Sequence, residues 1–94
     1  MKPNDIYQMH ADICKSLSNS KRLQIIEILG QGKTSSSQLI SRLKINKVTL
    51  SQNMKILLNQ GIARSEKRGK SVQYQLADSR IIKACRLMRE VLIS

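Results

Sequence analysis

A short segment after Asn46 combines an apolar helical face with polar side chains that suit contact with nucleic acid. Asn46 is a typical helix N-cap and Gly61 a typical helix stop, so a helix is expected between them. Leu50, Met54 and Leu57 share one face at 100° per residue, which leaves the opposite face exposed. The side chains placed outward or at the helix start are Lys47, Val48, Thr49, Ser51, Gln52 and Lys55.

This outward face offers the groups that the major groove of duplex DNA requires. Gln52 can form paired hydrogen bonds with adenine N6 and N7, and Val48 can contact a thymine methyl group. Lys55 can meet guanine or a phosphate, while Lys47 and Thr49 lie where helix amides reach phosphate oxygens. Further phosphate contacts are expected from the start of the preceding helix, at Ser35, Ser36 and Ser37. The simpler interpretation is a solvated helix face, and this segment alone does not separate the two.

A second basic feature follows at residues 62–76. Alternating residues predict strands at 62–67 and 71–76, and Gly69 supplies the positive φ that a tight turn between them needs. Within this hairpin only Glu66 opposes four basic side chains, which are Arg64, Lys67, Arg68 and Lys70. Beside a recognition helix, such a hairpin would lie along flanking phosphates or the minor groove. A charged turn that only keeps the protein soluble is the alternative for any one of these residues.

A winged helix-turn-helix is the fold that places these two features side by side. Only residues 44–46 separate the two helices of the helix-turn-helix, the first of which starts at a capping box over residues 35–38. The fold class expected is mainly α with a small β-hairpin, and Asp78 or Ser79 caps the last helix. The order is four helices, the hairpin and a fifth helix. The expected helices cover about residues 5–17, 20–29, 36–43, 47–60 and 78–93.

Composition limits the function further. The chain has 94 residues and a formal net charge of +11, so we expect a single domain over residues 1–94 and a polyanionic partner. Aromatic residues make up 2% of the chain, which argues against folds that stack exposed rings on single-stranded nucleic acid. One histidine, no glycine-rich phosphate loop and no paired carboxylates leave no catalytic constellation, so we expect no enzyme and no cofactor.

The ends and cysteines indicate a compartment. The N-terminus lacks the apolar run of a signal peptide, and no apolar stretch approaches membrane length. Cys14 and Cys85 form no CxxC motif. We therefore expect a cytoplasmic protein with no membrane partner.

Three stretches, in the same order, resemble the ArsR/SmtB repressors. Residues 17–26, LSNSKRLQII, are similar to the second-helix signature LSDPxRLxIL, and residues 45–57, INKVTLSQNMKIL, to the recognition helix of that family. Residues 68–76, RGKSVQYQL, match its wing pattern GxxVxYxL, so the resemblance covers nearly the whole chain. Ser20 replaces the usual Pro. Asn53 replaces the usual His, and we expect it to alter which bases are tolerated.

The resemblance implies a homodimer that binds an imperfect palindrome in duplex DNA, represses a promoter and is released by an inducer. The dimer would form through the first and last helices, at about residues 5–18 and 78–93. Their apolar stripes exceed what a three-helix core can cover, which agrees with such an interface. The stripes comprise Ile6, Met9, Ile13 and Leu17 in the first helix and Ile81, Cys85, Met88 and Leu92 in the last.

The metal ligands of the family are missing from this chain. Residues 35–37 are serines where the arsenic and lead sensors carry thiols, and hydroxyl groups do not replace thiolates for soft ions. Of the zinc-type ligands on the last helix, Asp78 is present, but Arg80 replaces a His, and Val91 and Ser94 stand at the later positions. We therefore expect no metal ion, with Asp78 acting as an N-cap.

A thiol switch remains open as the sensor. His10 and Cys14 lie four residues apart on the first helix, and Cys85 would approach Cys14 if the terminal helices pack together. This resembles the redox-responsive branch of the family, whose first cysteine normally lies in the second helix, where this chain has Glu27 or a neighbour. The alternatives are two buried cysteines with no chemical role, or a Cys/His metal site.

Two other functions use the same fold. A winged helix can be a protein-interaction module, since fold alone does not settle function. A basic winged helix can also coat DNA without sequence preference. Salt dependence and site selection separate these alternatives from a regulator that binds an operator.

Overall fold

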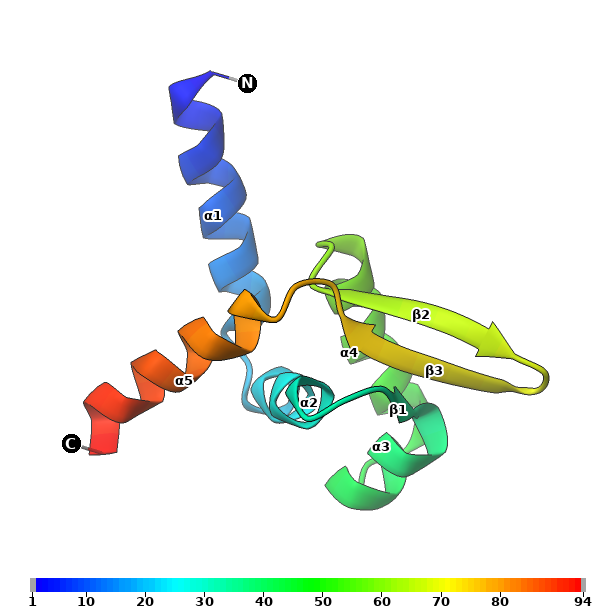
Figure 1. Ribbon diagram of the computed structural model, residues 1–94. Helices are drawn as coiled ribbons and strands as arrows, with labels where there is room; N and C mark the ends of the chain where they lie inside the picture. The colour runs from blue at the N-terminus through cyan, green and yellow to red at the C-terminus, as the bar shows by residue number, and fades with distance from the viewer. Residues whose placement is uncertain (1, 94) are drawn as a thin grey trace.

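The computed structural model describes residues 2–93, which form five helices and three short strands (Figure 1). Ser94, excluded above as a metal ligand, lies outside the described residues. The elements are α1 (Pro3–Leu17), α2 (Ser20–Gly30), β1 (Thr34–Ser35), α3 (Ser36–Leu43), α4 (Lys47–Asn59), β2 (Ala63–Arg68), β3 (Ser71–Leu76) and α5 (Arg80–Ile93). This order confirms the predicted winged helix-turn-helix, with one further helix at each end.

The wing is part of a three-stranded antiparallel sheet of order β1-β3-β2. In the hairpin Ala63 pairs with Leu76 and Arg68 with Ser71. The short strand β1, which the sequence analysis did not predict, adds Thr34 opposite Tyr74 on the other edge of β3. Two polar residues show no alternation, so β1 has no signal in the sequence. It attaches the base of the wing to the start of α3.

Side-chain caps define where α2, α3 and α4 begin. The Asn19 side chain accepts a hydrogen bond from the Arg22 amide, and the Asn46 side chain accepts one from the Thr49 amide at 2.7 Å. Ser35 forms the expected capping box with Gln38 at the start of α3. These bonds satisfy amides that a helix start otherwise leaves without partners.

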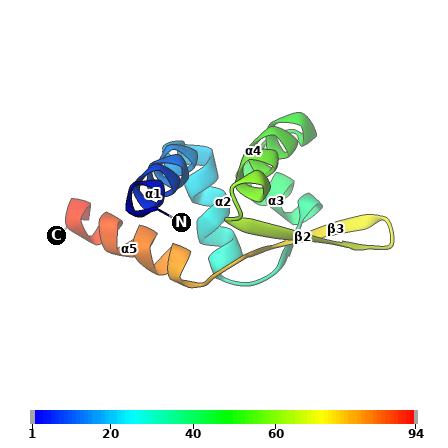
Figure 2. The ribbon, with the colours of Figure 1, turned by 90° about the horizontal axis from the view of Figure 1, so that it is seen from above.

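The core lies between α2, α3, α4 and the sheet. Leu50, Met54 and Leu57 are buried as predicted, against Ile26 of α2 and Leu39 of α3. Because α2 lies between the terminal helices and the helix-turn-helix (Figure 2), it is buried on more than one face. The helices α3 and α4 therefore pack against α2.

The terminal helices project from this core, α1 upward and α5 away from the wing (Figure 1). The inner residues of their apolar stripes meet the core, Cys85 being buried and Leu17 and Ile81 half-buried. The outer residues stay exposed, with 51% of Ile6 and 82% of Leu92 accessible. One chain thus leaves much of both apolar stripes uncovered.

Candidate nucleic-acid interface

The outward face of α4 holds the side chains that the sequence analysis assigned to base contact. Val48, Ser51, Gln52 and Lys55 are all exposed, with 64% of Val48 accessible, and Lys47 is exposed at the helix start. The opposite side of the helix is in the core, so this face is rigidly presented. Its mixture of amide, hydroxyl, methyl and ammonium groups suits the edges of base pairs in a major groove.

Two residues of α4 are held by contacts within the protein. The Thr49 amide, expected to reach a phosphate, donates instead to the Asn46 side chain, and Thr49 itself is half-buried. Asn53 is only 9% exposed, and its side-chain amide donates to the Thr49 carbonyl at 2.9 Å. Its oxygen accepts a hydrogen bond from Arg22 of α2. The Asn53 side chain therefore points into the protein, and its effect on which bases are tolerated stays a prediction.

The three serines at the start of α3 have separate roles. Ser35 is buried and caps the helix, and the half-buried Ser36 donates its hydroxyl to the Val72 carbonyl of β3 at 3.3 Å. Ser37 is exposed, and its hydroxyl lies 3.2 Å from that of Ser35. Ser37 is thus the serine of this group best placed for an external phosphate.

The wing carries exposed cations on both of its faces. Side chains of a strand alternate between faces, so Arg64 and Arg68 share one face of β2 and Lys67 lies on the other. Lys70 is exposed at the turn, where Gly69 has a φ of +61°. Because both faces of the hairpin carry cations, either face can contact a phosphate backbone.

Glu66 is the acidic residue within this basic ribbon. Its carboxylate accepts hydrogen bonds from Arg68 Nε at 3.2 Å and from Lys33 Nζ at 3.4 Å. The hydrogen bond from Arg68 and its charge, together with Lys33, hold the pKa of Glu66 below its ordinary value. The charge of Arg68 is therefore partly compensated in the free protein. Lys33, which sequence reasoning missed, adds a cation at the base of the wing.

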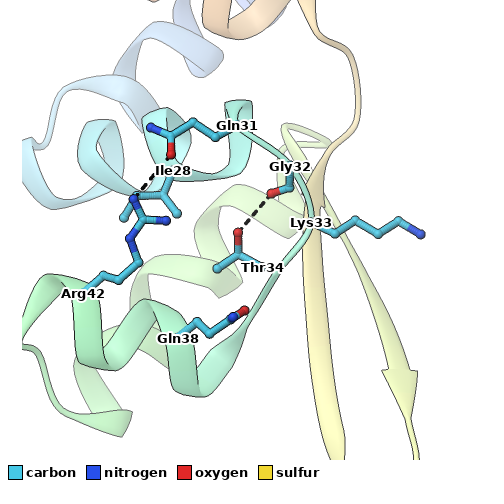
Figure 3. Close-up of a pocket in the computed structure, with 7 residues that line it drawn as sticks. All are labelled: Ile28, Gln31, Gly32, Lys33, Thr34, Gln38 and Arg42. Carbon is cyan, nitrogen blue, oxygen red and sulfur yellow. Dashed lines mark hydrogen bonds between the residues drawn. The ribbon is translucent and has the colours of Figure 1, made fainter.

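A polar hollow of about 250 Å³ lies between α2, β1 and α3 (Figure 3). Within it the Thr34 hydroxyl donates to the Gly32 carbonyl, and Arg42 donates to the Gln31 side chain at 3.4 Å. The Lys33 side chain points away from the other lining residues (Figure 3). The residues that line this hollow include no carboxylate, histidine or cysteine, so the hollow offers no acid–base pair.

Both cysteines line one cavity of about 260 Å³ between α1, α2 and α5. Cys14 is exposed and Cys85 is buried, both are free thiols, and burial raises the pKa of Cys85. The two cysteines thus line the same cavity, and their pairing stays a prediction. His10 lines a neighbouring groove with Cys14 and Asp78.

Clustered metal ligands and membrane-spanning helices are absent from the part of the chain that the structure describes. Over residues 2–93, no group of three His, Cys, Asp or Glu side chains is arranged to hold a metal ion. None of the helices in this range is both long and apolar enough to cross a bilayer.

Asp78 accepts hydrogen bonds from the backbone and guanidinium of Arg80, at the start of α5. Those bonds hold the pKa of Asp78 far below its usual range.

Comparison with known proteins finds a family model and close structural neighbours. The model of the bacterial regulatory protein, ArsR family, matches residues 19–65, from the cap of α2 into the wing. The arsenical resistance operon repressor of Staphylococcus aureus is 33% identical over 70 residues, covering 74% of this chain and 67% of that protein. The transcriptional activator HlyU of Vibrio cholerae is 30% identical over 69 residues, covering 73% of this chain and 64% of that protein.

Solved structures share the fold along nearly the full chain. HlyU of Vibrio cholerae superposes with a TM-score of 0.84 at 26% identity, covering 100% of both chains. The homodimeric winged helix-turn-helix DNA-binding domain Mb0332 of Mycobacterium bovis has a TM-score of 0.86 at 24% identity, covering 97% of this chain and 84% of that one. The chain spans between 36% and 67% of the lengths of three curated relatives it matches.

Proposed function

Because the chain belongs to the ArsR family of bacterial regulatory proteins, we propose that it is a transcriptional repressor that binds a palindromic operator as a homodimer. The observation that carries this proposal is the exposed face of α4 beside a cationic wing. Val48, Ser51, Gln52 and Lys55 stand outward from a helix whose other side is in the core. A rigid polar helix flanked by a basic ribbon is the geometry by which winged helices read duplex DNA.

The proposed DNA contacts divide into a base-reading group and a group that contacts the phosphates of the DNA backbone. Gln52 is the main candidate for base discrimination because its amide can bond to adenine at two points, and Val48 would pack on a thymine methyl group. The other contacts would fix register on the phosphates. These backbone contacts are assigned to Lys47, Thr49 through its side chain, Ser37, Arg64, Lys67, Arg68 and Lys70, with Lys55 reaching a phosphate or guanine.

The dimer would form through α1 and α5. Most of the exposed large apolar residues that the structure describes lie on these two helices, and self-association would bury them. The Mycobacterium bovis neighbour is itself a homodimer. A two-fold axis places one recognition helix in each of two successive major grooves, about 34 Å apart, and so requires a palindromic site.

Repression would follow from occupying the promoter, and a signal that changes the dimer would release it. The relatives include both repressors and an activator. That this protein represses rather than activates is therefore part of the proposal. No catalytic role is proposed. A DNA-binding regulator acts where the chromosome lies, so the proposal places the protein in the cytoplasm.

The test is a binding-site selection on random duplexes, followed by titrations at several salt concentrations. A regulator should select a palindrome and lose affinity by roughly 0.9 log units per log unit of salt for each phosphate contact. A flat salt response would instead support a protein-interaction module. A steep salt response with no selected sequence would support nonspecific coating of DNA.

A thiol switch is the second proposal, and it rests on the cavity that Cys14 and Cys85 share. The two thiols would join as a disulfide, with two protons and two electrons passing to hydrogen peroxide, which leaves as two water molecules. Cys14 would be oxidised first because it is exposed, whereas burial raises the pKa of Cys85. Peroxide should then weaken operator binding in the parent and not in Cys85→Ser. Equal behaviour of the two proteins would exclude the switch.

A further inference from the structure

A polar link through Arg22 joins α1 to α4. Arg22 lies in the first turn of α2, and its Nε donates to the carbonyl oxygen of Ser16 in the last turn of α1. Its Nη1 donates to Oδ1 of Asn53 on α4 at 3.3 Å. Asn53 Nδ2 then donates to the Thr49 carbonyl at 2.9 Å. One guanidinium therefore contacts both a helix assigned to the dimer and the helix assigned to DNA.

We propose that Arg22 and Asn53 are positioning residues that set the angle of α4 relative to α1, and thereby the spacing of the two operator half-sites. This inference rests on the proposed function, because it assumes a dimer that reads two half-sites. Neither residue contacts DNA in it. Their effect is on where the two α4 helices lie relative to each other.

The chemistry of Arg22 suits this role. A guanidinium is a planar fork of donors in fixed directions, so two acceptors bound to it are held at a defined separation and angle. The Ser16 carbonyl belongs to the end of α1, where helix carbonyls lack partners within the helix. Ser16 is buried and Arg22 half-buried, so water competes little for these bonds. A lysine has three donors on one rotating ammonium nitrogen rather than a planar fork, so it would not hold the two acceptors at a fixed separation and angle.

The side-chain amide of Asn53 can bind Arg22 in one orientation only. Arg22 has donors and no acceptor, so the oxygen of the Asn53 side chain must face Arg22. The amide nitrogen is then fixed on the Thr49 carbonyl. Thr49 lies between Val48 and Ser51 on the turn of α4 that begins the reading face. The link therefore ends on the backbone beneath the proposed base contacts.

Half-site spacing is sensitive to such an angle. Each α4 must enter a major groove, and the two grooves are about 34 Å apart along the DNA. A small rotation between α1 and α4 is doubled by the two-fold axis and displaces both helices from their grooves. A dimer with a loose α1–α4 angle should accept several spacings with similar affinity, whereas a fixed angle should favour one.

The experiment measures affinity for the selected palindrome, for palindromes with up to two base pairs added or removed at the centre, and for one half-site. The parent should prefer one spacing by roughly tenfold or more, the discrimination that one misplaced base contact typically brings. In Arg22→Gln this preference should fall to about twofold while affinity for the half-site stays within about twofold. Arg42→Gln removes the same charge from the exposed surface of α3 and should keep the preference of the parent.

Two conservative variants separate positioning from general stability. Arg22→Lys should restore charge but not the spacing preference, because an ammonium group lacks the planar fork that fixes the two acceptors. Asn53→Asp keeps an oxygen for Arg22 but places a carboxylate against the Thr49 carbonyl, so it should also broaden the preference. A parental spacing profile in Arg22→Gln or in both conservative variants would overturn the inference. So would an equal loss of affinity for every duplex, the half-site included, since it would indicate only a damaged fold.

A readout without DNA separates this inference from the proposed function. Spin labels on Asn59→Cys, at the exposed end of α4 in a Cys14→Ser background, report the distance between the two α4 helices of a dimer. Arg22→Gln should broaden that distance distribution, and an unchanged distribution would overturn the link. If the parent selects no palindrome, the proposed function fails, whatever the distances show.

Discussion

Glu27 of α2 accepts hydrogen bonds from Arg86 and Arg89 of α5, with Arg86 Nη2 at 2.9 Å and Arg89 Nη2 at 3.1 Å from its carboxylate oxygens. This contact attaches α5, with its exposed apolar stripe, to the helix at the centre of the core. The Glu27 carboxylate thus has a structural role between α2 and α5.

The Glu27 contact predicts how stability depends on pH. The hydrogen bond from Arg86, with the charges of both arginines, holds the pKa of Glu27 below its ordinary value of 4.5. A carboxylate with a lowered pKa in the folded state stabilises the fold above its unfolded pKa, and this contribution is lost as the pH falls through the folded value. The melting temperature of Glu27→Gln should therefore be lower than that of the parent near neutral pH and converge with it below about pH 4.5. Thermal unfolding across roughly pH 3 to 7 measures this.

The control for that experiment is Glu90→Gln, which removes one carboxylate from the exposed surface of α5. Because it leaves the hydrogen bonds of Glu27 to Arg86 and Arg89 in place, this variant should retain the loss of stability on acidification that these bonds cause. A constant difference between Glu27→Gln and the parent at every pH would contradict the assignment.

Gln52 and Lys70 should differ in how they affect DNA binding. Gln52→Ala removes the paired amide contact, so a repeated site selection should show a relaxed preference at one position of each half-site, equivalent to about 1–3 kcal/mol. Lys70→Ala takes a cation away from the phosphates at the wing turn and should weaken all duplexes alike. It should also reduce the slope of affinity against salt by roughly 0.9 for each phosphate that Lys70 neutralises. An unchanged selected site in Gln52→Ala would remove Gln52 from the base-reading group.

Gly30 is required where α2 approaches α5. A Cβ at this position would lie 2.7 Å from Cγ1 of Ile82, closer than packed carbon atoms tolerate. Gly30→Ala should therefore destabilise the fold by about 1–3 kcal/mol in urea unfolding, although alanine is the better helix former. Ile82→Ala removes the atom that clashes. It should therefore lower the free energy of unfolding less in the Gly30→Ala background than in the parent. Additive effects in that double-mutant cycle would mean that the neighbours give way freely.

Met88 tests the dimer surface. It is 57% exposed in one chain, so Met88→Lys should leave the protomer folded while placing a charge in the proposed interface. Sedimentation should then report a mass near that of one chain, and affinity for the full palindrome should fall to that for one half-site. Lys83→Gln, also exposed on α5, should remain dimeric. A dimeric Met88→Lys would place the interface elsewhere.

The sequence predicts the local features of this fold well. The caps at Asn46 and Ser35 and the helical spacing of Leu50, Met54 and Leu57 act over a few residues, so each is visible in the chain itself.

What the sequence did not reveal are contacts between polar residues distant in the chain. Nothing local indicates that Arg22 meets Asn53 or that Lys33 meets Glu66. A signal for Asn53 did exist, since it follows Leu50 by three residues and precedes Leu57 by four, which puts it near the buried face. The resemblance to the family's recognition helix drew attention instead to its possible contact with bases.

The uncovered apolar stripes of α1 and α5 bear on how much protein a cell must make. A protomer that binds its full site only as a pair reaches the operator in proportion to the square of its own concentration, as long as most chains are single. Occupancy then rises steeply over a narrow range of protein level, and a repressor acting on its own promoter would stop its synthesis sharply. The expression level at which this happens depends equally on the free energy of the proposed dimer contact through α1 and α5 and on the free energy of DNA binding.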